Sequence, residues 1–336
     1  MVEEMSVKEE MAVNSDFPMS KSVSITIALV VSMLTLESCS KDNDSSKDNT
    51  AVKTVSFSIN DYKVVDDSGT VLTRTSFIDR TDGVTYVWSA CDTVGIYPTS
   101  GAQIYFPIDG AGGESHADFD GGGWAFKTSA KYYSYYPFIG DIYLDRNKIP
   151  VSYVGQRQVG ASNNDHVGPY DYMFTPACSS DGGKLNFKYK HLGCILRFNL
   201  TALPVGNYTK LAITAPSESF VKSGWFNLQS DSPVIIGKEF TKQLIVDLEE
   251  INITDSSTQV YVYLLSAPVQ IKGIEVTVSV LNDQKKELQC KKTPPMNFEA
   301  QTRYGLKCSE WTEVPQSMGM IIDGWDDGGS LGGDAE

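Results

Sequence analysis

The chain has 336 residues, enough for about two domains of ordinary size. Hydrophobic residues make up 41% of the chain and aromatic residues 11%, so it can bury substantial cores and is not disordered throughout. A formal net charge of −14 and the lack of a basic patch argue against DNA or RNA as a partner.

An apolar segment near the N-terminus ends at a single cysteine. Residues 21–36 read KSVSITIALVVSMLTL, with Lys21 as the positive start. The apolar run has the length of a signal-peptide core and is short of the ~20 residues that a spanning helix needs. Leu36 and Ser38 precede Cys39, as in a lipobox, so we expect Cys39 to be lipidated and to anchor the mature chain by acyl chains. The alternative is an ordinary cleaved signal or an uncleaved anchor.

The residues around this segment complete the expected signal peptide, residues 1–39. Met19 is the expected initiator, because residues 1–18 are acidic where a signal peptide should begin with positive charge. Residues 40–51 are polar and charged as far as Ala51 and predict a flexible tether. An acidic tether directly after a lipidated cysteine resembles the surface-export signal of some Gram-negative lipoproteins. The expected location is therefore the outer membrane and the cell surface.

From Ala51 onward the pattern predicts one strand after another. In AVKTVSFSI the apolar positions are Val52, Val55, Phe57 and Ile59, and from Val55 their period is two. Similar runs follow, separated by clusters of glycine, aspartate, asparagine and proline. No later stretch keeps helical spacing over ten residues with caps, and SNNDHVGPYDYMF has the composition of a loop. The lack of alternating strands and helices argues against a parallel α/β enzyme fold.

A turn cluster, PACSSDGGKLN at residues 176–186, divides these strands into two halves. The second half opens on the apolar run HLGCILRFNL and contains IEVTVSV and QVYVYLL, which alternate like half-buried sandwich strands. We therefore expect an all-β chain with two β-sandwich domains in tandem, residues 52–182 and 183–326. Residues 327–336 are acidic and glycine-rich and predict a flexible tail.

The sequence patterns of common catalytic sites are absent from the chain. Its histidines, His116, His166 and His191, are far apart, and no GxSxG, HExxH or P-loop motif occurs. His191 and Cys194 lie three residues apart, which on a strand places them on opposite faces, so they are interpreted as unrelated residues. The expectation is a protein that is not an enzyme and has no cofactor. A hydrolase stays a distant third reading, since paired carboxylates in a cleft cannot be recognised from sequence.

Two further features can be explained either by an ordinary structural role or by a specific site. DFDGGG, from Asp118 to Gly123, could hold a calcium ion through its carboxylates, but a plain hairpin loop explains it as well, and no metal site is expected. Cys290 and Cys308 lie near the ends of two candidate neighbouring strands and could form a disulfide. The favoured interpretation is that they serve as small core residues, like the other isolated cysteines. The cysteines besides Cys39 are Cys91, Cys178, Cys194, Cys290 and Cys308.

The stretch KYYSYYPF, residues 131–138, is the most aromatic part of the chain. Its rings cannot all share one face of a straight strand, so most of them are expected to pack on both sides of a sheet. The alternative is a sugar-binding or adhesive surface, for which Tyr135 and Tyr136 are the candidate ligand contacts.

Several motifs in order resemble the fimbrillin-like family of lipoprotein pilus subunits from Gram-negative anaerobes. After the lipobox come TRTSF at 73–77, VWSACDTVGIY at 87–97 and the tyrosine-rich YYSYYPF. KYKHLGCILRFNL, NFEAQTRYGLK at 297–307 and the closing IIDGWDDGG follow. Together these matches span residues 36–328, nearly the whole chain.

The resemblance implies a surface lipoprotein whose subunits each have two transthyretin-like sandwich domains. In this family a protease specific for basic residues cuts a loop after the first strand, and the lipidated N-terminal piece leaves. The open groove and the unpaired backbone edge that remain are costly in water. A strand from another subunit fills the groove, and this head-to-tail contact propagates into a fibre.

Carried onto this chain, the resemblance makes AVKTVSFSI the strand to be removed, with the apolar side chains named above. The cut would fall after Arg74 or Arg80, and Lys63 is a weaker choice. The alternative is an uncleaved subunit in which Arg74 is a surface residue.

The segment QSMGMIIDGW is the candidate donor strand, with Met318, Met320 and Ile322 on one face. It could equally pair within its own domain. The expected function is a structural or adhesive pilus subunit whose partners are other pilus subunits, the membrane, and a host or bacterial surface glycan or protein. The alternative function is a surface glycan-binding lipoprotein that does not polymerise.

Overall fold

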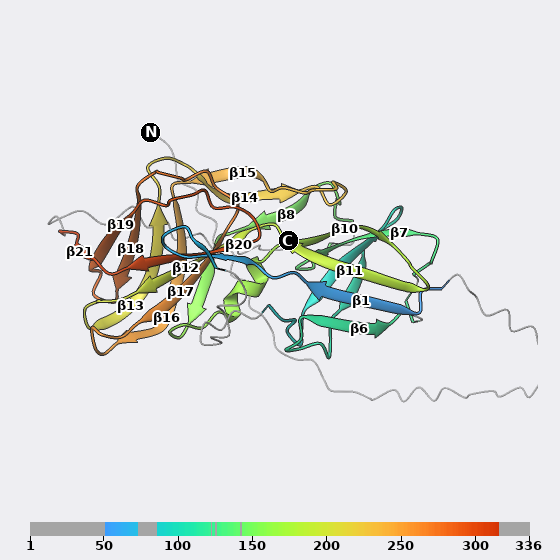
Figure 1. Cartoon of the computed structure of the whole chain (residues 1–336), viewed down its shortest axis with the longest axis horizontal. Helices are drawn as coiled ribbons and strands as arrows, with labels where there is room; N and C mark the ends of the chain where they lie inside the picture. Colours follow the sequence, from blue (N-terminus) through green and yellow to red (C-terminus); the bar gives the residue numbers. More distant parts are fainter. Residues whose placement is uncertain (1–50, 73–85, 122, 125, 142, 316–336) are drawn as a thin grey trace, which may run out of the picture. The chain divides into compact units, whose positions relative to one another are not determined.

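The computed structural model describes residues 51–72, 86–121, 123–124, 126–141 and 143–315, and Figure 1 shows them as strands and connecting loops. The regular secondary structure of the described residues is almost entirely β-strand, which confirms the all-β prediction. The segment expected to be a loop contains one short 3-10 helix, η3 (Asp165–Tyr170). Among the described residues, no helix combines the length and the apolar character needed to cross a membrane.

The strands are short, as the spacing of the turn residues predicts. In chain order they are β1 (Thr54–Ile59), β2 (Lys63–Val65), β3 (Val71–Leu72), β4 (Thr93–Pro98), β5 (Ile104–Pro107), β6 (His116–Asp120), β7 (Lys131–Tyr136), β8 (Ile149–Ser152), β9 (Gln156–Val159), β10 (Met173–Ser179), β11 (Lys184–His191), β12 (Cys194–Leu200), β13 (Gly206–Thr214), β14 (Phe220–Phe226), β15 (Ile236–Thr241), β16 (Gln243–Ile253), β17 (Val260–Ser266), β18 (Val276–Asn282), β19 (Glu287–Lys292), β20 (Thr302–Cys308) and β21 (Thr312–Glu313).

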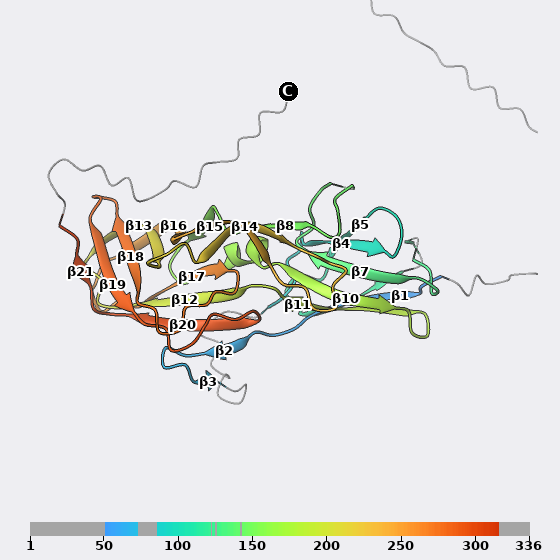
Figure 2. The same ribbon diagram turned by 90° about the horizontal axis from the view of Figure 1, so that it is seen from above.

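These strands form four sheets, whose members can be followed in Figures 1 and 2. The sheet with β1 has the order β5-β4-β7-β10-β11-β1-β6. A second sheet has the order β17-β12-β20-β2-β3, and a third the order β21-β19-β18-β13-β16-β9. The fourth is the small sheet β15-β14-β8.

Period-two alternation in the sequence becomes alternating burial in the sheets. In β11 the side chains of Leu185, Phe187 and Tyr189 are fully buried, while the residues between them are exposed or half-buried. Successive side chains of a strand point to opposite faces, so this strand covers a core with one face only. The same alternation runs along β16 from Leu244 to Leu248, and after an irregularity at Glu250 it resumes in the opposite phase at Ile251 and Ile253.

The buried side chains form two separate hydrophobic cores. The first core contains residues of β1, β4, β5, β7 and β11, and its largest members are aromatic, among them Phe57, Trp88 and Phe106. The second core is formed mainly by β12 to β14 and β16 to β20. It also includes Tyr62 and Val65 from the N-terminal part of the chain.

The sheets do not divide at residue 183, where the sequence places a domain boundary. β11 follows that position, yet it pairs with β1 and β10, and its side chains belong to the first core. β8 and β9 precede it, yet they pair with β14 and β16. The turn cluster before Lys184 closes a β10–β11 hairpin, so its turn chemistry marks a connection within one sheet.

Candidate functional site

Residues 51–72, called the N-terminal segment here, contribute strands to two sheets. β1 lies between β11, to which it is parallel, and β6, to which it is antiparallel. Its backbone is also bonded beyond the ladder, since the amide of Asn60 donates to the carbonyl of Tyr189 at 3.0 Å. β1 is therefore an inner strand of its sheet, with neighbours along both edges.

The apolar side chains expected in the removed strand are core residues. Val52, Val55 and Phe57 are fully buried, and Ile59 is half-buried at the edge of the first core. Phe57 is surrounded by rings: its centroid lies 4.9 Å from that of Phe106. The other rings in contact with it are those of Phe119, Phe187 and Tyr189. Aromatic side chains contribute large buried areas, so Phe57 is the main anchor of β1.

On its other face, β1 is hydrogen-bonded through a side chain to β6. Ser56 is buried, and its hydroxyl donates to Asp118. This hydrogen bond, with the nearby charge of Lys184, lowers the pKa of Asp118 below its usual value. Asp118 also lies 3.3 Å from His116 and 3.4 Å from Lys184. No group of three or more metal-ligating side chains occurs among the described residues, and Asp118 to Asp120 of the DFDGGG motif form the end of β6.

Beyond β1 the N-terminal segment joins the sheet of the second core. β2 runs parallel to β20, and β3 forms the edge of that sheet. The β2–β3 turn is held by Asp67, which accepts from the amide of Lys307 at 3.1 Å and lies 3.7 Å from the ammonium of Lys292. Lys63, the weaker candidate for cleavage, is exposed but begins β2, with its amide bonded to Gln301. A protease would have to open this pairing to cut there.

The linker between β1 and β2 is held by a buried polar cluster that the sequence did not reveal. The side chain of His191, at the end of β11, is fully buried, and its Nδ1 lies 2.8 Å from the Oδ2 of Asp171. Its Nε2 lies 2.7 Å from the carbonyl oxygen of Asn60. The hydroxyl of Tyr62 donates to Asp171 at 2.6 Å, and its ring centroid lies 3.8 Å from that of His191.

Both ring nitrogens of His191 lie within hydrogen-bonding distance of an oxygen atom, one on Asp171 and the other the carbonyl oxygen of Asn60. Burial and the charge of Asp171 raise the pKa of Tyr62 well above its usual value, so its hydroxyl stays a donor. The cluster thereby connects the β1–β2 linker with β11 and with the loop after η3.

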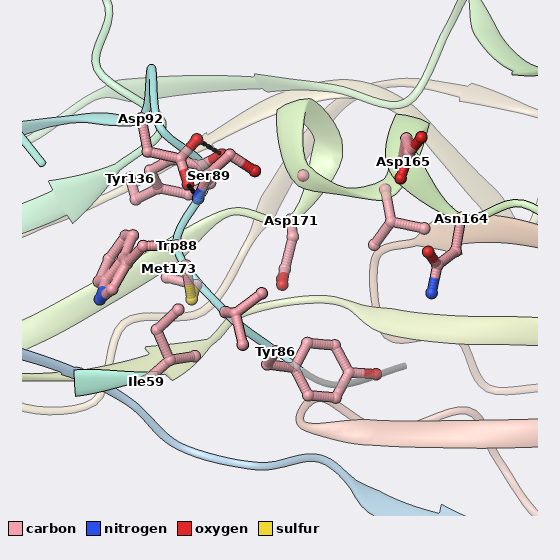
Figure 3. Close-up of a pocket in the computed structure, with 13 residues that line it drawn as sticks. Ile59, Tyr86, Trp88, Ser89, Asp92, Tyr136, Asn164, Asp165, Asp171 and Met173 are labelled. Atoms are coloured by element: carbon pink, nitrogen blue, oxygen red, sulfur yellow. Dashed lines mark hydrogen bonds between the residues drawn. The ribbon is translucent and has the colours of Figure 1, made fainter. Parts of the chain in front are cut away.

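A cavity of about 140 Å³ lies beside this cluster and is lined by Ile59 of β1 (Figure 3). In Figure 3, Ser89, Asp92 and Tyr136 group on one side and Asn164 and Asp165 on the other. Asp92 accepts from the amide of Ser89 at 2.7 Å and from the hydroxyl of Tyr136 at 2.9 Å. Pockets for organic ligands usually measure roughly 300–1,000 Å³, so this cavity suits ordered water better than a sugar ring.

The two tyrosines that are candidate ligand contacts under the alternative interpretation are buried. Tyr135 is fully buried and donates to the Oε1 of Gln103 at 2.8 Å. Burial raises its pKa to about 12. Tyr136 is 6% exposed and has its hydroxyl on Asp92. Tyr132 and Tyr136 belong to the first core and Tyr135 to the second, so the rings of β7 pack on both sides, which agrees with the core interpretation.

His166, Cys194, Cys290 and Cys308 lie in different elements of the fold. His166 in η3 donates through Nε2 to the carbonyl of Tyr263 at 3.0 Å, and burial lowers its pKa. Cys194 opens β12 in the second core and donates to the carbonyl of Ser266 at 3.4 Å, so it is unrelated to His191, as expected. Cys290 and Cys308 lie in β19 and β20.

Several predicted site residues lie outside the described residues. They are Cys39, the cleavage candidates Arg74 and Arg80, and the donor candidates Met318, Met320 and Ile322. The residues missed from sequence are Asn60, Tyr62 and Asp171. For Asp171 the sequence offers one signal, the polar cluster DHVGPYD at residues 165–171, whose composition is that of a loop.

No protein-family model and no curated protein matches this chain. Among solved structures it resembles a candidate cell adhesion protein from Bacteroides uniformis, with 14% identity over 68% of this chain and 91% of that one, and a TM-score of 0.46. A candidate cell adhesion protein from Bacteroides ovatus is 15% identical over 79% of this chain and 97% of its own, with a TM-score of 0.46.

The tip fimbrial protein Mfa3 from Porphyromonas gingivalis, with a C-terminal truncation, is 10% identical over 78% of this chain and 99% of its own, with a TM-score of 0.36. These names agree with the resemblance to the fimbrillin-like family.

Proposed function

We propose that this protein is a structural or adhesive subunit of a surface fibre, carried to the outer membrane by a lipid on Cys39 and assembled by strand removal and strand exchange. The observation that carries the proposal is the placement of the N-terminal segment. It supplies an inner strand to one sheet and two strands to another. Its only covalent connection to the later strands runs through residues 73–85. A cut after Arg74 or Arg80 leaves it held by noncovalent contacts alone.

Departure of this segment opens a site for another strand. β11 and β6 lose their partner, so their backbone groups and the rings around Phe57 become exposed. Unpaired edges and exposed apolar surface are both costly in water. An incoming strand that restores the ladders, and that places apolar side chains where Val55 and Phe57 lay, removes this cost. Loss of β2 and β3 opens β20 in the same way.

The segment of this chain that best matches the vacated site is QSMGMIIDGW. Met318, Met320 and Ile322 alternate as Val55 and Phe57 do, so one face of such a strand is apolar. A strand donated to the next subunit makes a head-to-tail contact that does not close, and such contacts propagate as fibres. The partner is therefore a second subunit of the same kind. The burial of Tyr135 and Tyr136 favours this proposal over the glycan-binding alternative, which needs exposed contacts.

The test is controlled cleavage of the purified full-length precursor with an arginine-specific protease. We expect discrete loss of the N-terminal piece, identified by its mass, and SDS-resistant polymers that form afterwards. The matched control replaces Arg74 and Arg80 by lysine, which keeps the charge and removes the cleavage site. A precursor that is cut at these arginines and stays monomeric would refute assembly by strand exchange.

A second arm tests the donor strand. The same precursor lacking residues 319–336 should be cleaved normally and remain soluble but should form no polymers. Mixing it with cleaved full-length protein should shorten the fibres, since a subunit without a donor ends the chain. Normal fibres from the truncated protein alone would refute the donor role and leave the cleavage step standing.

A further inference from the structure

The edge strand β17 is hydrogen-bonded on both of its sides, although only one side faces another strand of its sheet. β17 ends the sheet β17-β12-β20-β2-β3 and is paired with β12 along its whole length. Alternate residues of an antiparallel strand direct their backbone groups to opposite sides. The amide and carbonyl groups of Tyr261, Tyr263 and Leu265 face away from β12, and each of them is bonded to another part of the chain.

Two buried glutamines of β9 supply most of these partners. The side-chain amide of Gln156 donates to the carbonyl of Leu265 at 2.8 Å and accepts from the amide of the same residue at 2.7 Å. Gln158 accepts from the amide of Tyr263 at 2.9 Å and donates to the carbonyl of Tyr261 at 2.9 Å. A glutamine side chain offers a donor and an acceptor, as a backbone peptide does. Each side chain therefore takes the place of a residue in a neighbouring strand.

The remaining two groups are bonded by residues that follow β9. The amide of Tyr261 donates to the hydroxyl of Ser162 at 3.2 Å. The carbonyl of Tyr263 accepts from the Nε2 atom of His166 at 3.0 Å. Buried backbone groups without a partner are costly, so these bonds stabilise the strand at its outer edge. Residues 156–166, called the edge cap here, thus satisfy the whole outer edge of β17.

The edge cap is fixed to a different sheet. β9 pairs in parallel with β16 of the sheet β21-β19-β18-β13-β16-β9. Gln156 and Gln158 are 1% and 0% exposed, whereas Arg157 between them is exposed and forms an ion pair with Glu249 of β16. β9 therefore extends one sheet with its backbone and closes the edge of another with its side chains.

β17 lacks the features that usually protect an open edge. Its sequence, VYVYLLS, has no charged residue and no proline, and its ladder with β12 runs without a bulge. β15, the edge of the small sheet, shows the contrast, since Lys238 and Glu239 are exposed and its pairing with β14 is irregular. Charged side chains and bulges discourage strand addition, and a regular apolar edge favours it. Protection of β17 therefore depends on the edge cap.

We propose that the edge cap closes β17 to strand addition, so that a second copy of this chain does not pair there. The other edge of the same sheet is formed by β2 and β3 of the N-terminal segment. If that segment leaves, as the proposed function requires, β20 is exposed while β17 stays covered. The sheet then accepts a strand on one side only, beside β20. This consequence rests on the proposed function, whereas the closure of β17 is a property of the uncleaved chain.

Amide hydrogen exchange in the purified full-length precursor tests whether the edge is closed. We expect the amides of Tyr263 and Leu265 to exchange as slowly as the alternate amides of β17 that face β12. The double variant Gln156→Ala, Gln158→Ala removes their partners. Exchange at both amides should then accelerate about tenfold, the change expected for the loss of one hydrogen bond. Fast exchange in the parent, or unchanged exchange in the variant, would overturn the proposal.

Loss of the cap should also allow the uncleaved precursor to pair with itself. Sedimentation velocity should show a dimer of the double variant that grows with protein concentration and that the parent does not form. Exchange at Tyr263 and Leu265 should slow again as the dimer forms, because the edge amides then pair across the contact. A double variant that exchanges quickly and stays monomeric would show that the edge cap is not a barrier to strand addition.

The matched control is Gln243→Ala. Gln243 lies in β16, and its side chain donates to the hydroxyl of Thr214 at 2.9 Å, so the change removes a glutamine without touching β17. This variant should match the parent in exchange at β17 and in sedimentation. Equal dimerisation of the control and the double variant would contradict the assignment of the barrier to the edge cap.

A milder variant keeps the test decisive if the double variant does not fold. Gln158→Ala alone should accelerate exchange at Tyr263 and leave Leu265 as in the parent. Neither measurement involves cleavage at Arg74 or Arg80. An open β17 edge would therefore refute the edge cap without touching the proposed function. Failure of the cleaved protein to polymerise would likewise leave the closure of β17 standing.

Discussion

The Nδ1 atom of His191 lies 2.8 Å from the Oδ2 atom of Asp171, in a polar contact with almost no exposure to solvent. Because the other ring nitrogen bonds to the carbonyl of Asn60, this pair is also what holds the linker between β1 and β2. A polar contact at the end of β11 therefore contributes to the retention of the N-terminal segment. Four predictions follow from this relationship and its surroundings.

Loss of the His191 ring should lower the free energy of unfolding. In His191→Gln the carboxyl group of Asp171 stays buried and loses its imidazole partner, and loss of a partner from a buried polar group costs about 1–3 kcal/mol. The free energy of unfolding, measured with urea, should fall by that amount. His116→Gln is the control, because His116 is exposed and its replacement should change stability by less than about 0.5 kcal/mol. Combining His191→Gln with Asp171→Asn should recover part of the loss, and additive effects would show that the two residues are not coupled.

Truncation of Phe57 should loosen β1 more than truncation of Ile59. Phe57→Ala removes a ring that contacts four others and should cost about 3–5 kcal/mol. Ile59 is half-buried, so Ile59→Ala should cost clearly less. Amide hydrogen exchange in β1 and β11 should accelerate in Phe57→Ala. Equal exchange rates in the two variants would contradict the role of Phe57 as the anchor.

Gly121 should tolerate no side chain. A Cβ atom there would lie 2.8 Å from the carbonyl oxygen of Val52 and 3.1 Å from a methyl group of Val55. Gly121→Ala should therefore displace β1 and destabilise the fold by about 1–3 kcal/mol. Gly123→Ala is the matched control, because nothing lies within 4 Å of the added atom. If both variants unfold at the same urea concentration, the close approach of β1 to this turn is not a constraint.

His166 should make the fold less stable in mild acid. Burial lowers its pKa in the folded protein, so the unfolded chain binds a proton first as the pH falls. Because the unfolded state then holds more protons, stability decreases as the pH falls below about 6.5, the ordinary histidine value, towards the lowered one.

The measurement is the urea midpoint at about pH 7.5 and about pH 5.5, in the parent and in His166→Gln. Glutamine can keep the hydrogen bond to the Tyr263 carbonyl but does not titrate. The difference between the two midpoints should be smaller in the variant. His116→Gln serves as the control, since His116 is exposed. An unchanged difference in His166→Gln would show that this ring contributes nothing to the acid sensitivity.

The sequence by itself predicted the fold class and the composition of β1. Alternation along AVKTVSFSI placed Val55 and Phe57 on the buried face, because the period-two geometry of a strand is local and is visible in any short run. Packing of the tyrosines on both faces of β7 could be predicted for the same reason. The transthyretin-like topology implied by the resemblance stays a prediction.

Pairing between distant strands was decided only in the tertiary structure. β1 pairs with β11, which lies more than a hundred residues later in the chain. β8 pairs with β14 and β9 pairs with β16, and neither pairs with a strand next to it in the sequence. Nothing local in these strands specifies a partner, because every strand offers the same backbone groups and register depends on which faces bury together. The contacts of His191 with Asp171 and Asn60 exist only because such long-range pairing brings the residues together.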